Sequence, residues 1–426
     1  MKISYKDIGF EKALLRKPKK LPPAKRPNFL FKTLLKIVSL FDLLAVKFKA
    51  NKIGMDKLKR KEPCLILMNH CCFLDLEIAS SVLYPKTINI VTTTDAFVDK
   101  AWLMRQLGCI PINKFSTNPQ VVKECIRLVK KKNSSILMYP EAGYSFDGTA
   151  TTMASTIGKF VKMLNVPLVT IITHGAFLRQ PLYNNLRKRK IKVTADVEYV
   201  LSPEEIQKMT PSEINEVVYK KFGFDAFKEQ QDAKLVIDDP NRAEGLERVM
   251  YKCPHCLSEE HMEGKGTTVK CHKCGAEYEL TEIGYLKNIN GDTKIDHVPS
   301  WYKWEREEVK KELERGEYVT DTDVEIYILK DPYKLYKLGE GHLHHDSDGF
   351  TLTGGDGLLN YHQGVKHSHS VNSDFYWYQV SDIVCVGDHK VLYYCVPKIR
   401  LMLQKLDWQL KNYIRCKALE KSNAFL

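Results

Sequence analysis

Residues 64–199 alternate apolar runs of strand length with amphipathic runs of helix length, and this alternation constrains the fold more than any other feature. Strands are expected at residues 64–68, 87–91, 135–139, 166–172 and 192–199. Helices are expected at residues 74–83, 100–107, 119–131 and 152–164. This order predicts an α/β domain with a parallel or mixed sheet. Ser202 and Pro203 then start a helical segment, to about residue 231, that closes the domain.

The strand at 64–68 leads into Asn69 and His70, and four residues separate His70 from Asp75. Open α/β sheets bind ligands at the carboxyl ends of their strands. Asp75, in the first turn of the next helix, can reach back and hold the imidazole. A histidine oriented in this way can deprotonate a substrate hydroxyl directly. The alternative is a histidine of the core beside an aspartate that caps a helix.

Three more blocks follow at residues 108–114 (GCIPINK), 138–145 (MYPEAGYS) and 166–170 (VPLVT). Together with the His70 block, they resemble the glycerolipid acyltransferase family, over roughly residues 30–200. The resemblance implies that His70 is the catalytic base and that Asp75 orients it. It also implies that Glu141 and Gly143 bind the acceptor.

Two positions depart from the family pattern. The second block of the family usually ends in arginine, and here that residue is Lys114. The third block usually ends in arginine as well, and here that residue is Tyr144. Arginine binds phosphate through two hydrogen bonds, lysine binds it only as a point charge, and tyrosine carries no charge. The expected substrate-binding residues are Asn69, Lys114, Glu141, Gly143 and Tyr144.

The resemblance implies an acyltransferase of the 1-acylglycerol-3-phosphate type, acting in phospholipid biosynthesis. It would move an acyl group from acyl-CoA or acyl carrier protein to the hydroxyl of a lysophospholipid or glycerol phosphate. No other organic cofactor is expected. A catalytically inactive lipid-binding scaffold is the alternative that Lys114 and Tyr144 keep open, although the His70–Asp75 pair argues against it.

Residues 1–60 hold 17 Lys and Arg but only 4 Asp and Glu, whereas the remainder holds 48 of each. Within this segment, residues 29–48 form a narrow polar stripe and a wide apolar face at helical spacing. Such a helix is too charged to span a bilayer but fits an anionic membrane surface. We therefore expect a peripheral or monotopic protein at the cytoplasmic face of a membrane. The alternative is a helix of the core with a solvated basic tail. Nucleic acid is an unlikely partner, because no arginine–aromatic platform accompanies the basic residues.

Two CxxC pairs lie 14 residues apart, at the spacing of a zinc ribbon. The expected ligands of one structural Zn²⁺ are Cys253, Cys256, Cys271 and Cys274. His255 and His272 lie inside the pairs as alternative ligands, and a ribbon that recruits a partner to the membrane is an alternative function. A redox role for the pairs is less favoured. The other cysteines are scattered, which indicates a reducing, intracellular compartment.

The expected domains are residues 1–60, the acyltransferase domain 61–235, the ribbon 245–285, a helical connector 286–316 and a β-rich domain 317–426. In the last domain, short alternating runs separated by glycine turns predict antiparallel strands. The runs lie at residues 324–329, 341–345, 349–353, 375–380, 383–386 and 391–396. A terminal helix is expected at residues 398–419, so the element order resembles a pleckstrin-homology-like domain. The histidines of this domain are interpreted as polar turn residues, with a second metal site as the alternative: His342, His344, His345, His362, His367 and His369.

Overall fold

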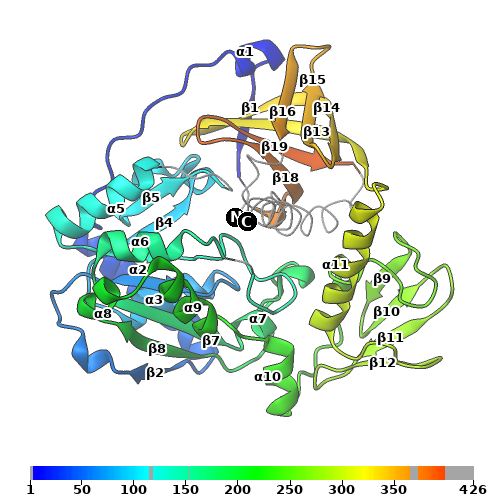
Figure 1. Ribbon diagram of the computed structural model, residues 1–426, viewed down its shortest axis with the longest axis horizontal. Helices are drawn as coiled ribbons and strands as arrows, with labels where there is room; N and C mark the ends of the chain where they lie inside the picture. Colours follow the sequence, from blue (N-terminus) through cyan, green and yellow to red (C-terminus); the bar gives the residue numbers. More distant parts are fainter. Residues whose placement is uncertain (1–2, 115–118, 152, 365–372, 399–426) are drawn as a thin grey trace, which may run out of the picture.

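The computed structural model describes residues 3–114, 119–151, 153–364 and 373–398. Figure 1 shows three folded regions: an α/β region, a small antiparallel sheet and a larger antiparallel sheet. Helix α11 (Val298–Glu314) runs from the small sheet toward the larger one and so connects them.

A seven-stranded sheet in the order β2-β8-β7-β3-β6-β4-β5 forms the centre of the α/β region. β8 is antiparallel to β7 and parallel to β2, whereas the strands from β7 to β5 are mutually parallel. The strands are β2 (Lys49–Ile53), β3 (Leu65–Met68), β4 (Ile88–Thr93), β5 (Cys109–Ile112), β6 (Ser135–Met138), β7 (Leu168–His174) and β8 (Thr194–Leu201). The mixed sheet is as predicted.

Helices cover both faces of this sheet. Leu65 and Leu67 belong to a core cluster with side chains of α5, α6, α8 and α9, whereas Ile66 and Met68 belong to another with side chains of α2 and α3. Alternate residues of one buried strand therefore serve two cores. The helices of this region are α2 (Phe29–Ala45), α3 (Leu74–Val82), α4 (Ala101–Gln106), α5 (Pro119–Lys132), α6 (Ile157–Leu164), α7 (Ala176–Arg179), α8 (Pro203–Lys208), α9 (Pro211–Lys221) and α10 (Ala226–Asp232). Ser202 caps α8 through a capping box, as expected.

In the α/β region, β2, β5 and the start of α6 differ from the sequence expectations. The sheet contains two strands that were not predicted, β2 and β5, and both are edge strands. β2 is fully exposed and lacks the apolar pattern of a buried strand, and β5 contains Pro111, which argues against a strand in the sequence. Helix α6 begins at Ile157 rather than 152, because the Thr151 amide is held by Glu141 (2.8 Å) and the preceding chain stays in a loop.

The small sheet has the order β12-β11-β10-β9 and is antiparallel throughout. Its strands are β9 (Met262–Lys265), β10 (Thr268–Cys271), β11 (Glu277–Leu280) and β12 (Leu286–Asn288). β12 lies inside the range that we expected to be a helical connector, but it pairs with β11 and belongs to this sheet.

The larger sheet has the order β16-β15-β14-β13-β19-β18-β17 and is antiparallel along this path, as predicted. Its strands are β13 (Thr320–Asp331), β14 (Lys334–Asp346), β15 (Gly349–Gly354), β16 (Leu359–Gly364), β17 (Ser373–Trp377), β18 (Ser381–Gly387) and β19 (Leu392–Pro397). The terminal helix expected at residues 398–419 lies outside the described residues, apart from Lys398, and so do His367 and His369.

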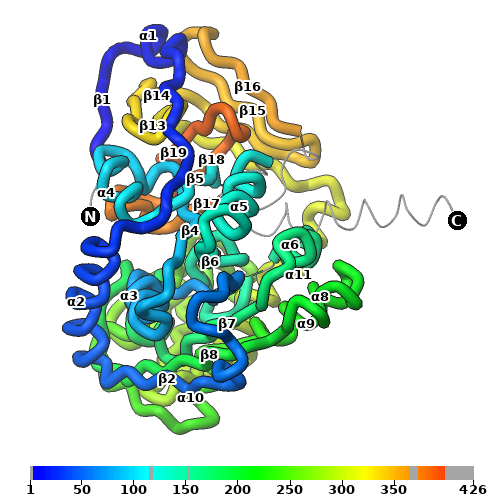
Figure 2. Tube along the Cα trace, turned by 90° about the vertical axis from the view of Figure 1, so that its left-hand side faces the viewer, coloured from blue at the N-terminus to red at the C-terminus, as the bar shows by residue number. Residues whose placement is uncertain are grey.

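The N-terminal segment runs along both large regions (Figure 2). Strand β1 (Tyr5–Asp7) pairs in parallel with β14, and α1 (Phe10–Leu14) follows it. Further along, the amide of Lys19 donates to Asp331, and Arg105 donates to the carbonyl of Pro22 (2.6 Å). This basic segment therefore packs on the protein and ties the C-terminal sheet to the α/β region.

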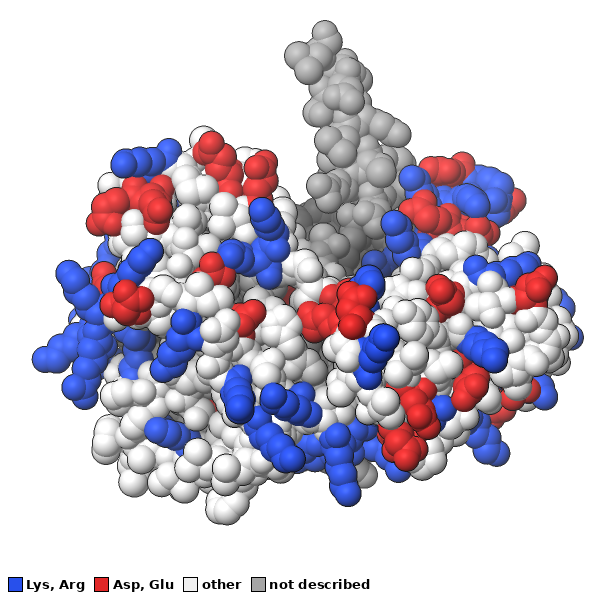
Figure 3. Space-filling view, turned by 90° about the horizontal axis from the view of Figure 1, so that it is seen from below, with Lys and Arg blue, Asp and Glu red and all other residues white. Residues whose placement is uncertain are grey.

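Helix α2 packs on α3 through buried Ser39 and Leu43. Its opposite side exposes a run of large apolar side chains: Phe29, Leu30, Leu34, Ile37, Val38, Leu40, Phe41 and Leu44. In Figure 3 this helix lies at the lower left, where the surface carries few charges and Lys and Arg gather nearby. Among the described residues, no helix is both long and apolar enough to cross a membrane.

Candidate active site

His70 follows β3 at the carboxyl end of the central parallel strands, and Asp75 lies in the first turn of α3. The imidazole Nδ1 is 3.1 Å from Oδ2 of Asp75. The Asp75 side chain is fully buried, whereas the His70 side chain is 21% exposed. The expected contact is therefore present, and it turns the other ring nitrogen, Nε2, away from the carboxylate.

Local backbone holds the Asp75 carboxylate in place. Its Oδ2 accepts hydrogen bonds from the amides of Cys71 (2.6 Å) and Cys72 (2.9 Å) as well as facing His70. These three groups come from the loop between β3 and α3, so a few consecutive residues build the pair. Both cysteine side chains are buried, and burial raises the pKa of each thiol well above its usual value.

Two tyrosines surround the imidazole. The Tyr139 ring stacks on His70 with 3.8 Å between ring centroids, and Tyr144 meets it edge-on at 4.3 Å. Burial raises the pKa of the Tyr139 hydroxyl well above its usual value, so this ring is an uncharged wall. Sequence reasoning missed Tyr139, although its position directly before Pro140 and Glu141 was a usable signal.

Glu141 is buried and braces two loops. One carboxylate oxygen accepts from the His70 amide (3.0 Å), and the other accepts from the Thr151 amide (2.8 Å). Burial raises the pKa of Glu141 to about 7, against the effect of these amides. Glu141 therefore contacts the backbone of the histidine, and its oxygens are already engaged.

The remaining expected residues lie in different settings. Asn69 is fully buried, and its amide group bonds to the backbone and hydroxyl of Thr173 on β7. This side chain joins β3 to β7 below the histidine. Gly143 is exposed and has no heavy atom near the position of a Cβ, so this turn is open.

Lys114 lies in a charge cluster between the α/β region and the larger C-terminal sheet. We define the Lys114 cluster as Asp95, Lys114 and Asp374. The ammonium of Lys114 is 3.2 Å from Asp95 and makes a short contact with Asp374 of β17. Burial lowers the pKa of Lys114, but the two carboxylates outweigh it and hold the pKa well above its usual value. The indole of Trp377 donates to Asp95 (2.9 Å).

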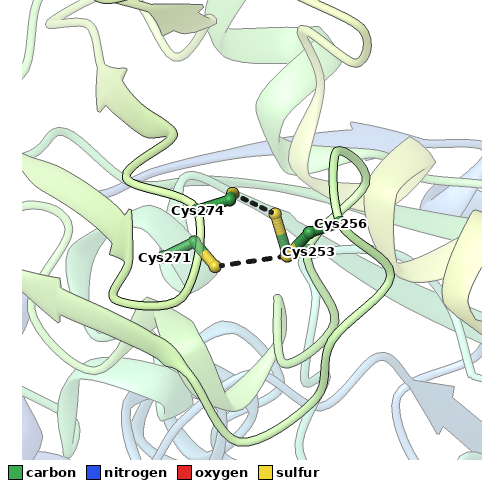
Figure 4. A group of neighbouring side chains, drawn as sticks. All are labelled: Cys253, Cys256, Cys271 and Cys274. Carbon is green, nitrogen blue, oxygen red and sulfur yellow. Dashed lines mark hydrogen bonds between the residues drawn. The ribbon is translucent and has the colours of Figure 1, made fainter.

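The four ribbon cysteines converge (Figure 4), and their sulfur atoms all lie within 4.8 Å of one another. The Cys253–Cys274 sulfur separation is 3.6 Å and the Cys256–Cys271 separation is 3.7 Å. Tetrahedral coordination at a Zn–S distance of about 2.3 Å requires sulfur atoms about 3.8 Å apart. The group can therefore hold a metal ion, and its donors and spacing fit Zn²⁺.

The two histidines inside the CxxC pairs have other partners. His255 is 2.8 Å from the hydroxyl of Tyr278, and His272 is 2.7 Å from the carboxylate of Glu263. Four thiolates are thus the ligand set that the geometry favours. Farther along, His342 and His344 bond to aspartates on β13 and β14. Among the described residues, the four cysteines form the group that can hold a metal ion, and these histidines do not.

The Acyltransferase family model matches residues 49–174, which contain His70, Asp75, Lys114 and Glu141. No curated protein matches the chain. Among solved structures, the chain is similar to the 1-acyl-sn-glycerophosphate (LPA) acyltransferase PlsC from Thermotoga maritima, at 13% identity and a TM-score of 0.35. That likeness covers 45% of this chain and 78% of the other. The family match starts at β2 and ends at β7, so it covers most of the α/β sheet and all of the sequence blocks, and the predicted resemblance is confirmed.

Proposed function

We propose that this chain transfers an acyl group from a thioester to the hydroxyl of a lysophospholipid or glycerol phosphate at a membrane surface. The donor is acyl-CoA or acyl carrier protein. The contact between His70 Nδ1 and the buried Asp75 carboxylate is the observation that carries this proposal, together with the family match around it. A histidine held by a buried acid, and partly open to solvent, suits a general base.

In the proposed reaction, Nε2 of His70 accepts the proton of the acceptor hydroxyl as its oxygen attacks the thioester carbonyl. A C–O bond forms, the C–S bond breaks, and the imidazolium returns its proton to the leaving thiolate. Asp75 holds the ring in the productive tautomer and stabilises the imidazolium. General-base assistance of this kind contributes about 10²- to 10⁴-fold in rate.

The other candidate residues receive roles that follow from their positions. Glu141 and Asn69 are buried with their polar atoms engaged, so we propose that they position His70. Gly143 and Tyr144 belong to a turn that solvent reaches, beside the imidazole. They are therefore the residues that we propose to contact the acceptor.

We further propose that α2 lies in the membrane interface, at the cytoplasmic face. Its exposed apolar side continues onto α4, because Phe31 meets the ring of Trp102 at 5.3 Å and Trp102 is 65% exposed. Exposed apolar surface of this extent, with flanking basic residues, fits a monotopic protein. The ribbon metal, which we propose to be Zn²⁺, serves folding, because four thiolates leave no open position for a substrate.

The experiment is acyl transfer from labelled acyl-CoA and acyl carrier protein to a panel of lysolipids, with His70→Ala beside the wild type. We expect a loss of about 10³-fold in the variant, within the range for a lost general base. His389→Ala, which changes an exposed histidine, is the matched control and should keep full activity. Lipid binding by the wild type without transfer from either donor would instead favour a catalytically inactive scaffold.

A second assay tests the membrane surface. Phe41→Asp places a charge on the exposed apolar side of α2 and should reduce binding to anionic vesicles at least tenfold. A comparable apolar-to-Asp change at an exposed position in the ribbon, Ile289→Asp, should leave vesicle binding within twofold. Equal binding by both variants would show that α2 does not dock on the membrane.

A further inference from the structure

Strand β17 brings the C-terminal sheet against the candidate active site. The ring of Phe375 stacks on Phe146, with centroids 4.0 Å apart and planes 18° apart. Phe146 lies two residues after Tyr144, whose ring touches His70. A short chain of contacts therefore connects the imidazole to β17, and Asp374 is the neighbour of Phe375 on that strand.

Asp374 reduces the ability of the Lys114 ammonium to bind a phosphate. The sequence blocks put Lys114 where the family has the arginine that suits a phosphate. Here one ammonium faces two carboxylates, and its side chain is only 10% exposed. The Lys114 cluster therefore carries no net positive charge. Asp95 accepts a hydrogen bond from the indole of Trp377, which also lies on β17. The C-terminal sheet therefore contacts the cluster through two residues, Asp374 and Trp377.

A phosphate monoester is a poor fit to this cluster. It carries a charge of about −1.5 to −2 at pH 7 and would approach two acidic side chains. Breaking a buried ion pair to free the ammonium is also costly, because it leaves an uncompensated charge. Tyr144, which stands in place of the second family arginine, supplies no positive charge to offset this.

We infer that Asp374 sets the acceptor class of this site, which is a lysolipid with a net-neutral headgroup, zwitterionic or uncharged, rather than a phosphate monoester. The inference rests on the proposed function, because it concerns the acceptor of the same acyl transfer. Asp374 acts as a specificity-determining residue from a second domain, since it occupies the ammonium that a phosphate would otherwise bind.

The test compares three acceptors at equal mole fraction in nonionic detergent micelles: lysophosphatidate, lysophosphatidylcholine and monoacylglycerol. We expect the wild-type kcat/KM for at least one of the two net-neutral acceptors to exceed that for lysophosphatidate by at least tenfold. In Asp374→Asn, the ratio of kcat/KM for lysophosphatidate to that for lysophosphatidylcholine should rise at least tenfold. Removing one carboxylate leaves a single acid opposite the ammonium, so repulsion of the phosphate falls.

Two variants serve as controls. Asp374→Glu keeps the charge and should keep the wild-type ratio within threefold. Asp356→Asn makes the same chemical change at an exposed turn of the same sheet and should leave the ratio within twofold. A wild-type preference for lysophosphatidate would overturn the inference, and so would a ratio unchanged in Asp374→Asn. If Asp374→Asn does not fold, the wild-type ranking of acceptors decides alone.

Equilibrium binding of the same micelles to the His70→Ala chain separates this inference from the proposed function. Transfer to some acceptor, combined with tighter binding of lysophosphatidate than of both net-neutral lipids, would refute the inference and leave the function intact. Absence of transfer to every acceptor, combined with at least tenfold tighter binding of a net-neutral lipid, would refute the function and with it the acceptor role, and would support only the preference of the site for net-neutral lipids.

Discussion

The His70 site and the Lys114 cluster are built from residues at very different separations along the chain. His70, Cys71, Cys72 and Asp75 lie in one loop and the first turn of α3. The Lys114 cluster joins Asp95 and Lys114 to Asp374, 260 residues beyond the lysine. The first arrangement depends on local backbone, whereas the second depends on two domains packing together. Changes at the first should affect catalysis, and changes at the second should also affect stability.

The ribbon cysteines are intermediate in separation, because two local pairs converge through a hairpin. We expect the largest effect on stability at these cysteines. Removal of metal by a chelator, or Cys256→Ser, should unfold the ribbon and lower the Tm of the whole chain. Apparent binding energies of structural Zn²⁺ are about 10–16 kcal/mol, and that binding energy stabilises the fold. Native mass spectrometry and calorimetry measure both effects.

The matched change is His272→Ala, inside the second CxxC pair. His272 bonds to Glu263 and is exposed, so this variant should retain one metal ion per chain and the wild-type Tm. Loss of the ion in His272→Ala, with retention in Cys256→Ser, would contradict the four-cysteine ligand set.

Lys114→Met tests whether the Lys114 cluster holds the two domains together. The change leaves buried Asp95 and partly exposed Asp374 without their cation, and breaking a buried pair costs about 3–5 kcal/mol in the free energy of unfolding. Denaturant unfolding measures it. Lys228→Met removes an exposed pair with Asp232 and should cause no measurable change. Equal unfolding curves for Lys114→Met and the wild type would show that the cluster does not support the packing.

Asp75→Asn tests the local site. The amides of Cys71 and Cys72 can still bond to the side chain, but the negative charge that favours the imidazolium is lost. We expect acyl transfer to fall about 10²-fold, at the lower end of the range for general-base assistance. Steady-state rates measure this loss, with exposed Asp348→Asn as the matched variant. Transfer within threefold of wild type would mean that Asp75 does not assist the base.

The same difference in separation explains what could be predicted from the sequence. The His70–Asp75 contact was predictable because strand, loop and helix are contiguous. The four cysteines were predictable because their spacing encodes a known geometry. The partners of Lys114 were not, because no local pattern marks Asp374 as a neighbour of a residue so distant in the chain. The edge strand β2 was missed for a related reason, since pairing with β8 defines it and its own residues are exposed.

Glu141 joins the His70 loop to a second loop, because its carboxylate accepts from the amides of His70 and Thr151. Its folded-state pKa of about 7 lies above the unfolded value near 4.3, so the folded state binds more protons between these values. Stability contributed by this group is therefore present below pH 4.3 and is lost as the pH rises through 7. From pH 5 to 7 the loss amounts to about 2 kcal/mol.

Glu141→Gln removes the titration while keeping the shape of the side chain. Urea unfolding of both chains from pH 5 to 7 should show the free energy of unfolding falling more steeply in the wild type. Gln can accept from only one of the two amides, so a constant offset between the chains is also expected. The slope, rather than the offset, reports the buried carboxyl. Parallel curves over this pH range would mean that Glu141 ionises as an ordinary exposed carboxylate and does not brace the loops in the way described.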